Sequence, residues 1–159
     1  MELPEFQRDI VGLLQRRLAE PRRFIQVVTG PRQTGKTTGI LQVVASLDMP
    51  WLYAVADVPA PPDPEWIGRQ WDMARARLAA RDRGLLVLDE VQKVSRWAEV
   101  VKRFWDEDTA AGRPLHVVVL GSSALLVKAG LEESLAGRFE MVRCPHWSFA
   151  ECRTCFGWS

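Results

Sequence analysis

One ten-residue stretch, GPRQTGKTTG at positions 30–39, constrains the fold of this chain more than any other. It directly follows the apolar run FIQVVT at positions 24–29. Its first two glycines are separated by four residues, and a lysine and a threonine come next, which is the pattern G-x-x-x-x-G-K-[ST] of a phosphate-binding loop. Such a loop joins a strand to a helix, so the stretch predicts a strand over 24–29 and a helix over 36–47.

The predicted loop would hold phosphate mainly through its backbone. Its N–H groups and the N-terminus of the following helix point to one spot, and the glycines let the backbone approach a ligand. Lys36 would reach the β- and γ-phosphates, and the hydroxyl of Thr37 would coordinate magnesium. Arg32 could also touch phosphate oxygens, whereas Thr38 equally suits the first turn of the helix. The candidate nucleotide-binding residues here are Gly30, Pro31, Arg32, Gln33, Thr34, Gly35, Lys36, Thr37 and Thr38.

A pair of acids follows a second apolar run. The segment LLVLDEVQK places Asp89 and Glu90 directly after residues 85–88, a short strand suited to the middle of a buried sheet. Asp89 would hold the hydration shell of a magnesium ion, and Glu90 would polarise an attacking water as a general base. Such a pair also suits the start of a helix. Because the loop and the acid pair each stand at the end of a predicted strand, together they favour a site that hydrolyses a nucleotide.

Apolar runs and amphipathic segments alternate along the rest of the chain, which predicts a parallel sheet covered by helices. Further strands are expected at 51–55, 115–120 and 138–143. Helices are expected at 5–18, at 64–81, from 97 onward and at 124–136. The first of them would place Phe6, Ile10, Leu13 and Leu14 on one face. The proline-rich segment VPAPPDP excludes regular structure before position 64, and a last helix is expected to begin near Ser148.

Composition and charge narrow the class of protein. The chain has 159 residues, enough for one domain with a hydrophobic core. Its 21 basic and 20 acidic side chains leave a net charge of +1, which gives no overall attraction to nucleic acid or to an anionic membrane. The opening residues MELPEFQRDI do not form a secretory signal, and three cysteines do not form a disulfide framework. We therefore expect a cytoplasmic protein without a membrane segment.

The segments GPRQTGKTT, LLVLDEVQK, VVVLGSS and LAGRFE, in that order, resemble the ATPase core of the AAA+ superfamily of P-loop proteins. More narrowly, the chain resembles bacterial and archaeal ATP-binding proteins whose AAA-type domain precedes a C-terminal domain of uncharacterised function. The resemblance extends to HWSFAE near the end. It implies a three-layer α/β fold with a central parallel sheet of strand order 5-1-4-3-2. It also implies an ATPase core over residues 1–147, including the N-terminal helix, and the start of a truncated C-terminal region at 148–159.

The resemblance implies two further site residues. In such proteins the strand after the acid pair ends in a polar residue that contacts the γ-phosphate or the water, and Ser122 or Ser123 occupies that place. Serine suits a turn or a helix N-cap equally well. Arg138 stands where related proteins carry an arginine finger that reaches into a neighbouring subunit, a contribution worth roughly 10³–10⁵ in rate. The alternative is an exposed arginine that pairs with the carbonyls of a helix C-terminus.

Three other patterns have plainer explanations. A zinc-like spacing joins Cys144, His146, Cys152 and Cys155, but a buried thiol is the favoured interpretation of Cys144. Acids are interspersed among Arg69, Arg75, Arg77, Arg81 and Arg83, which favours a solvated face, so nucleic-acid binding is not indicated. Apolar faces carry Trp71, Trp97 and Trp105, which we expect in the core. The sequence identifies no adenine-stacking tryptophan.

The sequence thus predicts an ATPase that binds ATP and Mg²⁺, with Lys36, Glu90 and Arg138 catalytic and with Thr37 and Asp89 at the metal. Its nucleotide state would act on a C-terminal domain absent from this chain, and a homo-oligomer would let Arg138 act in trans. Two alternatives stay open. One is a P-loop kinase of a small molecule, which would need an acceptor pocket and an arginine-rich lid. The other is a nucleotide-binding fragment without turnover. The lack of a guanine-reading N-K-x-D stretch mildly favours ATP over GTP.

Overall fold

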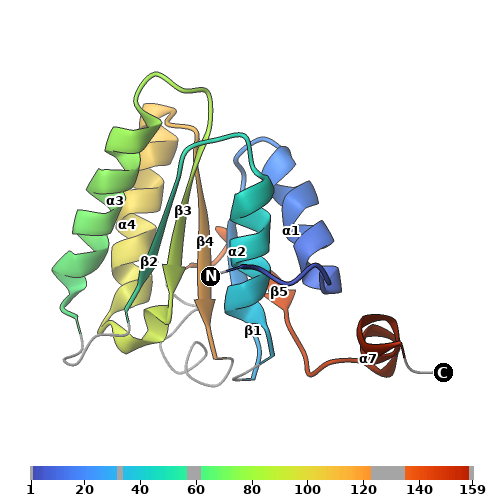
Figure 1. The fold of residues 1–159 in the computed structure, drawn as a ribbon. Helices are drawn as coiled ribbons and strands as arrows, with labels where there is room; N and C mark the ends of the chain where they lie inside the picture. The colour runs from blue at the N-terminus through green and yellow to red at the C-terminus, as the bar shows by residue number, and fades with distance from the viewer. Residues whose placement is uncertain (1, 32–33, 57–61, 123–134, 158–159) are drawn as a thin grey trace.

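Among the residues that the structure describes, five parallel strands form a central sheet with helices on both faces (Figure 1). This computed structural model describes residues 2–31, 34–56, 62–122 and 135–157. The strands are β1 (Ile25–Thr29), β2 (Trp51–Val55), β3 (Gly84–Asp89), β4 (Leu115–Gly121) and β5 (Phe139–Arg143). Their order in the sheet is β2-β3-β4-β1-β5. This is the predicted order 5-1-4-3-2 read from the other edge, so the predicted fold class is confirmed.

The helices complete a three-layer arrangement (Figure 1). On one face α1 (Asp9–Ala19) packs against α2 (Lys36–Ser46), and on the other α3 (Pro64–Leu78) packs against α4 (Trp97–Ala111). A short 3-10 helix, η1 (Val91–Lys93), joins β3 to α4, and α7 (Phe149–Phe156) follows β5 at the side of the sheet. Two apolar clusters fill the spaces between the layers. The cluster under α3 and α4 contains Trp71, Trp97 and Trp105, which are buried as predicted.

The first helix begins later than its apolar pattern predicts. It starts at Asp9 and not at residue 5, because the segment before it is tied to α2. The side-chain amide of Gln42 donates to the carbonyl oxygens of Pro4 and Phe6, at 2.9 Å each. Those carbonyls would otherwise accept the bonds of a first helical turn. Phe6 therefore does not lie on the predicted helix face, and its ring stacks on Trp147 with the centroids 5.4 Å apart.

Other boundaries differ less. Helix α3 ends at Leu78 and not at residue 81, because Ala79 adopts a positive φ of 42° that a helix cannot continue. Helix α7 begins directly after Ser148, as predicted, and Ser148 forms a capping box with Glu151. The predicted helix at 124–136 falls almost entirely outside the described residues.

The register of the strands determines where functional side chains can meet. All neighbouring strands run parallel, and Thr29 of β1 pairs with Gly121 of β4 while Leu88 of β3 pairs with Val119. The C-terminal ends of β1, β3 and β4 therefore lie side by side, along what we call the C-terminal edge of the sheet. In open α/β sheets this is the edge at which ligands bind.

Candidate functional site

The glycine-rich loop leaves the C-terminal end of β1 and enters the N-terminus of α2, as its pattern predicts. Arg32 and Gln33 lie outside the described residues. The ammonium of Lys36 donates to the carbonyl oxygens of Gly30, at 2.9 Å, and Pro31, at 2.6 Å. The Thr34 hydroxyl also donates to Pro31, at 2.9 Å. An ammonium has three donors, so these two bonds hold Lys36 across the loop and leave a third donor for a phosphate oxygen.

Two glycines of the loop are required for different reasons. A Cβ on Gly30 would lie 2.0 Å from the carbonyl oxygen of Cys144, so any side chain there would collide with the backbone after β5. The sequence suggests approach of a ligand as the reason for this glycine, whereas the structure shows approach of the backbone at Cys144, just after β5. Gly35 has a φ of +91°, a left-handed conformation that turns the chain into α2.

The two sequence motifs meet at Asp89. The hydroxyl of Thr37, in the first turn of α2, donates to Oδ2 of Asp89, at the end of β3, over 2.8 Å. Asp89 is buried with 4% of its surface exposed, and its Oδ1 accepts the backbone N–H of Glu90 at 2.8 Å. A hydroxyl and a carboxylate placed together at a helix N-terminus are oxygen ligands of the kind that Mg²⁺ prefers.

A third partner of Asp89 has no motif in the sequence. The hydroxyl of Tyr53, on β2, also donates to Oδ2 of Asp89. Burial, followed by the hydrogen bond to Asp89, raises the pKa of the Tyr53 phenol, so the phenol stays protonated and remains a donor. The only signal for this contact is geometric. Val55 pairs with Asp89 in the sheet, and Tyr53 lies two residues before Val55 and so on the same face.

Glu90 is positioned by its backbone as much as by its side chain. It adopts a left-handed conformation (φ 56°, ψ 34°), which is uncommon outside glycine and is found where a local structure holds it. Its Oε2 accepts a hydrogen bond from the Gln92 amide at 2.7 Å and lies 3.9 Å from the Lys93 ammonium. The Glu90 side chain is one third exposed, which leaves it accessible to water.

Ser122 directly follows β4, which lies between β1 and β3. It is partly exposed at the same sheet edge as the loop and Asp89. Ser123 lies outside the described residues. The structure therefore brings Ser122 to the edge where the two motifs meet.

Arg138 lies at the N-terminal ends of the strands, opposite the edge that carries the loop and Asp89. It precedes β5, whose first residue pairs with Ile25 at the start of β1, and the loop follows the far end of β1. Its guanidinium forms an ion pair with Asp106 of α4, with Nε–Oδ1 at 2.7 Å and Nη2–Oδ2 at 3.1 Å, and also donates to the carbonyl of Ala136. Arg138 cannot reach the phosphate loop of its own chain.

A hollow of about 210 Å³ opens beside the start of α2. Its walls come from the N-terminal segment, from the start of α2, from the connection between β5 and α7, and from α7 itself. They include Phe6, Gly35, Thr38 and Trp147, so two aromatic rings border the same hollow as the end of the loop. The sequence gives no periodicity that would reveal this, because Phe6 and Trp147 are 141 positions apart in numbering, at either end of the chain.

The family model described as an AAA domain matches residues 22–153, which include the loop, the acid pair and Ser122. The chain belongs to this AAA domain family. A solved structure similar to this AAA domain is the crystal structure of Cdc6p from Pyrobaculum aerophilum, with a TM-score of 0.64 and 15% sequence identity. The match covers 98% of this chain and 50% of that one, so this AAA domain spans about half the length of the Cdc6p chain. At this identity the likeness shows the fold alone. No curated protein matches the sequence.

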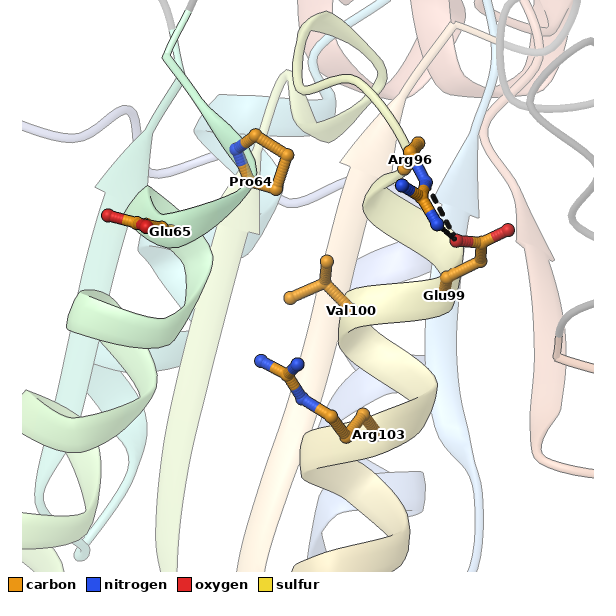
Figure 2. Close-up of a pocket in the computed structure, with 6 residues that line it drawn as sticks. All are labelled: Pro64, Glu65, Arg96, Glu99, Val100 and Arg103. Atoms are coloured by element: carbon orange, nitrogen blue, oxygen red, sulfur yellow. Dashed lines mark hydrogen bonds and ion pairs between the residues drawn. The ribbon is translucent and has the colours of Figure 1, made fainter.

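A second hollow, of about 390 Å³, lies between the N-terminal parts of α3 and α4 of this AAA domain (Figure 2). Two arginines and two glutamates line it, and Arg96 is already paired with Glu99, with Nη2–Oε2 at 2.8 Å. The hollow contains no residue of the loop or of the acid pair. Its mixed charges do not favour an anionic ligand such as phosphate.

The remaining patterns have intramolecular partners. Cys144 follows β5 instead of lying within it; it is fully buried, as expected, and its sulfur accepts from Arg8 at 3.2 Å. Within the described ranges, His, Cys, Asp and Glu side chains form no group of three or more suited to a metal ion. Arg75 pairs with buried Asp108, and Arg77 donates to the carbonyl of Trp51. No helix in the described part of the chain has both the length and the apolar character that crossing a bilayer requires.

Proposed function

We propose that this AAA domain binds ATP with magnesium and hydrolyses it to ADP and phosphate. The observation that carries the proposal is the 2.8 Å contact between Thr37 Oγ1 and Asp89 Oδ2. It joins two motifs separated by 52 positions, each at a C-terminal strand end or a helix N-terminus. Family membership supports nucleotide binding in general, and the identity of the nucleotide and its turnover are the proposal.

Groups on the loop, at the start of α2 and at the end of β3 would each contact a different part of the bound MgATP. Lys36 would give its third ammonium donor to a β- or γ-phosphate oxygen, while the N–H groups at the start of α2 face the same anion. Thr37 and Asp89 would hold magnesium, which when bound spreads the negative charge of the phosphates. Tyr53 keeps Asp89 in place because its hydroxyl bonds the same carboxylate oxygen that Thr37 does.

Hydrolysis requires a base and a positioned water. Glu90 would accept a proton from a water as the water oxygen bonds to the γ-phosphorus, while the bond from the γ-phosphorus to the bridging oxygen breaks and ADP leaves. The Gln92 amide, at 2.7 Å from Glu90 Oε2, holds the carboxylate in one orientation. Ser122 would contact the γ-phosphate or the water from the neighbouring strand end.

The base of the nucleotide would occupy the hollow beside α2. Phe6 and Trp147 offer apolar ring surface there, and the hollow adjoins Gly35 and Thr38 of the phosphate site. Ring surface of this kind accepts any base, so it does not by itself select adenine over guanine. A trans role of Arg138 in a homo-oligomer, and action on a C-terminal domain, stay predictions. The ion pair with Asp106 would have to open before Arg138 could reach a neighbour.

A calorimetric titration with MgATPγS tests nucleotide binding. We expect saturable binding by the wild-type chain and a loss of at least tenfold in affinity for Lys36→Ala, which removes the one lysine held on the loop. Lys102→Ala, on the far helix α4, is the matched control and should bind like the wild type.

Binding that Lys36→Ala retains in full would contradict the assignment of the loop. Phosphate release from MgATP then separates the alternatives. Release without any acceptor supports hydrolysis, ADP formation that requires an added small molecule supports a kinase, and binding with no turnover supports a nucleotide-binding fragment.

A further inference from the structure

Arg8 lies directly before α1 and is buried, with 6% of its surface exposed. Its guanidinium donates to three parts of the chain that are far apart in sequence: the phosphate loop, the connection from β5 to α7, and α7 itself. A guanidinium carries five N–H donors in a fixed planar fork. Because a buried charge is costly unless its donors are paired, Arg8 has to keep these partners, and it holds the three segments together.

On one side Arg8 holds the first turn of α7. Its Nε and Nη2 donate to the two carboxylate oxygens of Glu151, each at 2.8 Å, in a bidentate pair. The same carboxylate accepts the backbone N–H of Ser148 at 3.1 Å and so completes the capping box of α7. The Arg8 hydrogen bond lowers the pKa of Glu151 to about 2, so the pair is charged at neutral pH.

On the other side Arg8 holds the phosphate loop. Its Nη1 donates to the carbonyl oxygen of Thr34, a residue that is 1% exposed. Because the C=O and N–H of a trans peptide point in opposite directions, this bond turns the N–H of Gly35 away from Arg8. It thereby sets the orientation of the peptide between Thr34 and Gly35, one peptide before the one that leads into Lys36. The stem of Arg8 also lies 3.6 Å from the position that a Cβ of Gly35 would take.

The proposed base hollow is built from the same contacts. Arg8 lines it together with Phe6, Trp147 and Cys155, the last of which belongs to α7. The guanidinium carbon of Arg8 lies 5.2 Å from the centre of the Trp147 ring. A nucleotide in this hollow would therefore contact surfaces that α7 and Arg8 hold together.

We propose that Arg8 is a positioning residue that couples nucleotide binding at the loop to docking of α7, through Thr34 on one side and Glu151 on the other. The inference rests on the proposed function, because the coupling needs a bound nucleotide. Linkage makes it reciprocal: the factor by which nucleotide stabilises docked α7 is the factor by which docked α7 strengthens nucleotide binding.

Hydrogen exchange of the full chain, with and without saturating MgADP, tests the coupling. In the wild type MgADP should slow exchange both at the start of α2 and over residues 149–156. Glu151→Gln should lose the effect at α7 while keeping the effect at α2, and its calorimetric Kd for MgADP should rise about tenfold, within the usual range of coupling factors. Arg8→Lys keeps the charge but not the fork, and should behave in the same way.

Arg17→Lys is the matched control, because Arg17 lies on α1, the helix that follows Arg8, and donates to Gln26 of β1 and to the carbonyl of Met141 of β5. It should keep the wild-type affinity and the MgADP effect at α7.

Protection of α2 without protection of α7 in the wild type would overturn the coupling and leave nucleotide binding standing. Wild-type affinity and α7 protection in Glu151→Gln would also overturn it. A wild-type chain that does not bind MgADP would overturn the proposed function and the coupling together. Circular dichroism checks the fold of each variant. If Glu151→Gln proves to be unfolded, Arg8→Lys serves as the test variant in its place.

Discussion

Asp89 and Glu90 are adjacent in sequence but differ in how they are held. Asp89 is buried and accepts hydrogen bonds from Thr37, Tyr53 and the backbone of Glu90. Glu90 is one third exposed and turns outward on a left-handed backbone. A buried carboxylate whose oxygens already accept several hydrogen bonds is held in place and can serve as a fixed metal ligand. A carboxylate that is open to water can serve as a general base. Under the proposed function, these surroundings assign Asp89 to the metal and Glu90 to the attacking water.

This division predicts the effect of Glu90→Gln at the residue scale. The amide keeps the size of the side chain but cannot accept a proton, so we expect phosphate release to fall by roughly 10²–10⁴ while MgATP affinity stays within a few-fold of wild type. Phosphate release and calorimetry on the same sample measure the two quantities. Glu99→Gln, in the first turn of α4, is the control and should hydrolyse normally. Hydrolysis at the wild-type rate by Glu90→Gln with ATP bound would show that another group is the base.

Part of the site could be predicted from single residues. Lys36, Thr37 and Asp89 follow from spacing, because a loop or an acid at a strand end needs only local sequence to be recognised. Tyr53 and Arg8 could not be predicted in this way. Their roles depend on contacts with Asp89 on a neighbouring strand and with Glu151 at the far end of the chain. No periodicity records a contact of that kind.

At the scale of elements, α3 and α4 are joined by one buried acid. Asp108 of α4 is fully buried and accepts from the Trp71 indole at 2.7 Å, from Arg75 Nε at 2.8 Å and from Arg113 Nη1 at 3.0 Å. Its carboxylate thus connects α3, α4 and the turn that follows α4. A carboxylate in this position is stabilising only while these donors stay in place, since an unpaired buried charge is costly.

Asp108→Asn should therefore lower the free energy of unfolding by about 2–4 kcal/mol. That is less than the roughly 3–5 kcal/mol for breaking a fully buried pair, because the two arginines reach solvent. Urea denaturation measures it. Asp72→Asn removes an exposed partner of the same Arg75 and should cost no more than about 0.5 kcal/mol. Equal effects of the two substitutions would contradict the role of Asp108. Because α3 and α4 lie across the sheet from α2, nucleotide affinity should not change.

The elements themselves were largely predictable, since apolar runs and helical periodicity reflect burial directly. Their ends were less so. The start of α1 depends on Gln42 and the end of α3 on the φ of Ala79, and neither is visible in an apolar pattern. A helix boundary is decided by which partner takes the terminal hydrogen-bonding groups, and that partner can be remote in sequence.

At the scale of the whole molecule, the five-stranded parallel sheet determines what can form a site. Parallel strands bring their C-terminal ends to one edge of the sheet. The loop after β1, Asp89 of β3 and Ser122 after β4 therefore converge there although they are far apart in sequence. The same geometry places Arg138 at the other edge, out of reach of the phosphate loop of its own chain. The strand order follows from the family resemblance and not from periodicity, because alternation of strands and helices does not specify which strands are neighbours.

The interior of this sheet also makes the stability of the molecule depend on pH. His116 of β4 is 5% exposed, and burial, followed by the charges of Arg83 and Arg22, lowers its pKa to about 4 from an ordinary value of 6.5. Below pH 6.5 the unfolded chain binds a proton at this position that the folded chain does not bind. The stability that neutral His116 contributes is therefore complete above pH 6.5 and is lost as the pH falls towards 4, by about 3 kcal/mol in total. Glu151, whose pKa is lowered to about 2, acts in the same direction between pH 4.5 and 2.

Urea denaturation at several pH values between 8 and 4 tests this last prediction. The wild type should lose stability by up to about 1.4 kcal/mol per pH unit from this group below pH 6.5. His116→Leu fills the buried position with a group that does not titrate, so its curve should be flatter by that amount between pH 6.5 and 4. His146→Gln removes the exposed histidine of the connection to α7 and should keep the wild-type slope. If His116→Leu followed the wild-type curve in parallel, the pH dependence would have to come from carboxylates, because the buried imidazole would then be protonated without cost to the sheet.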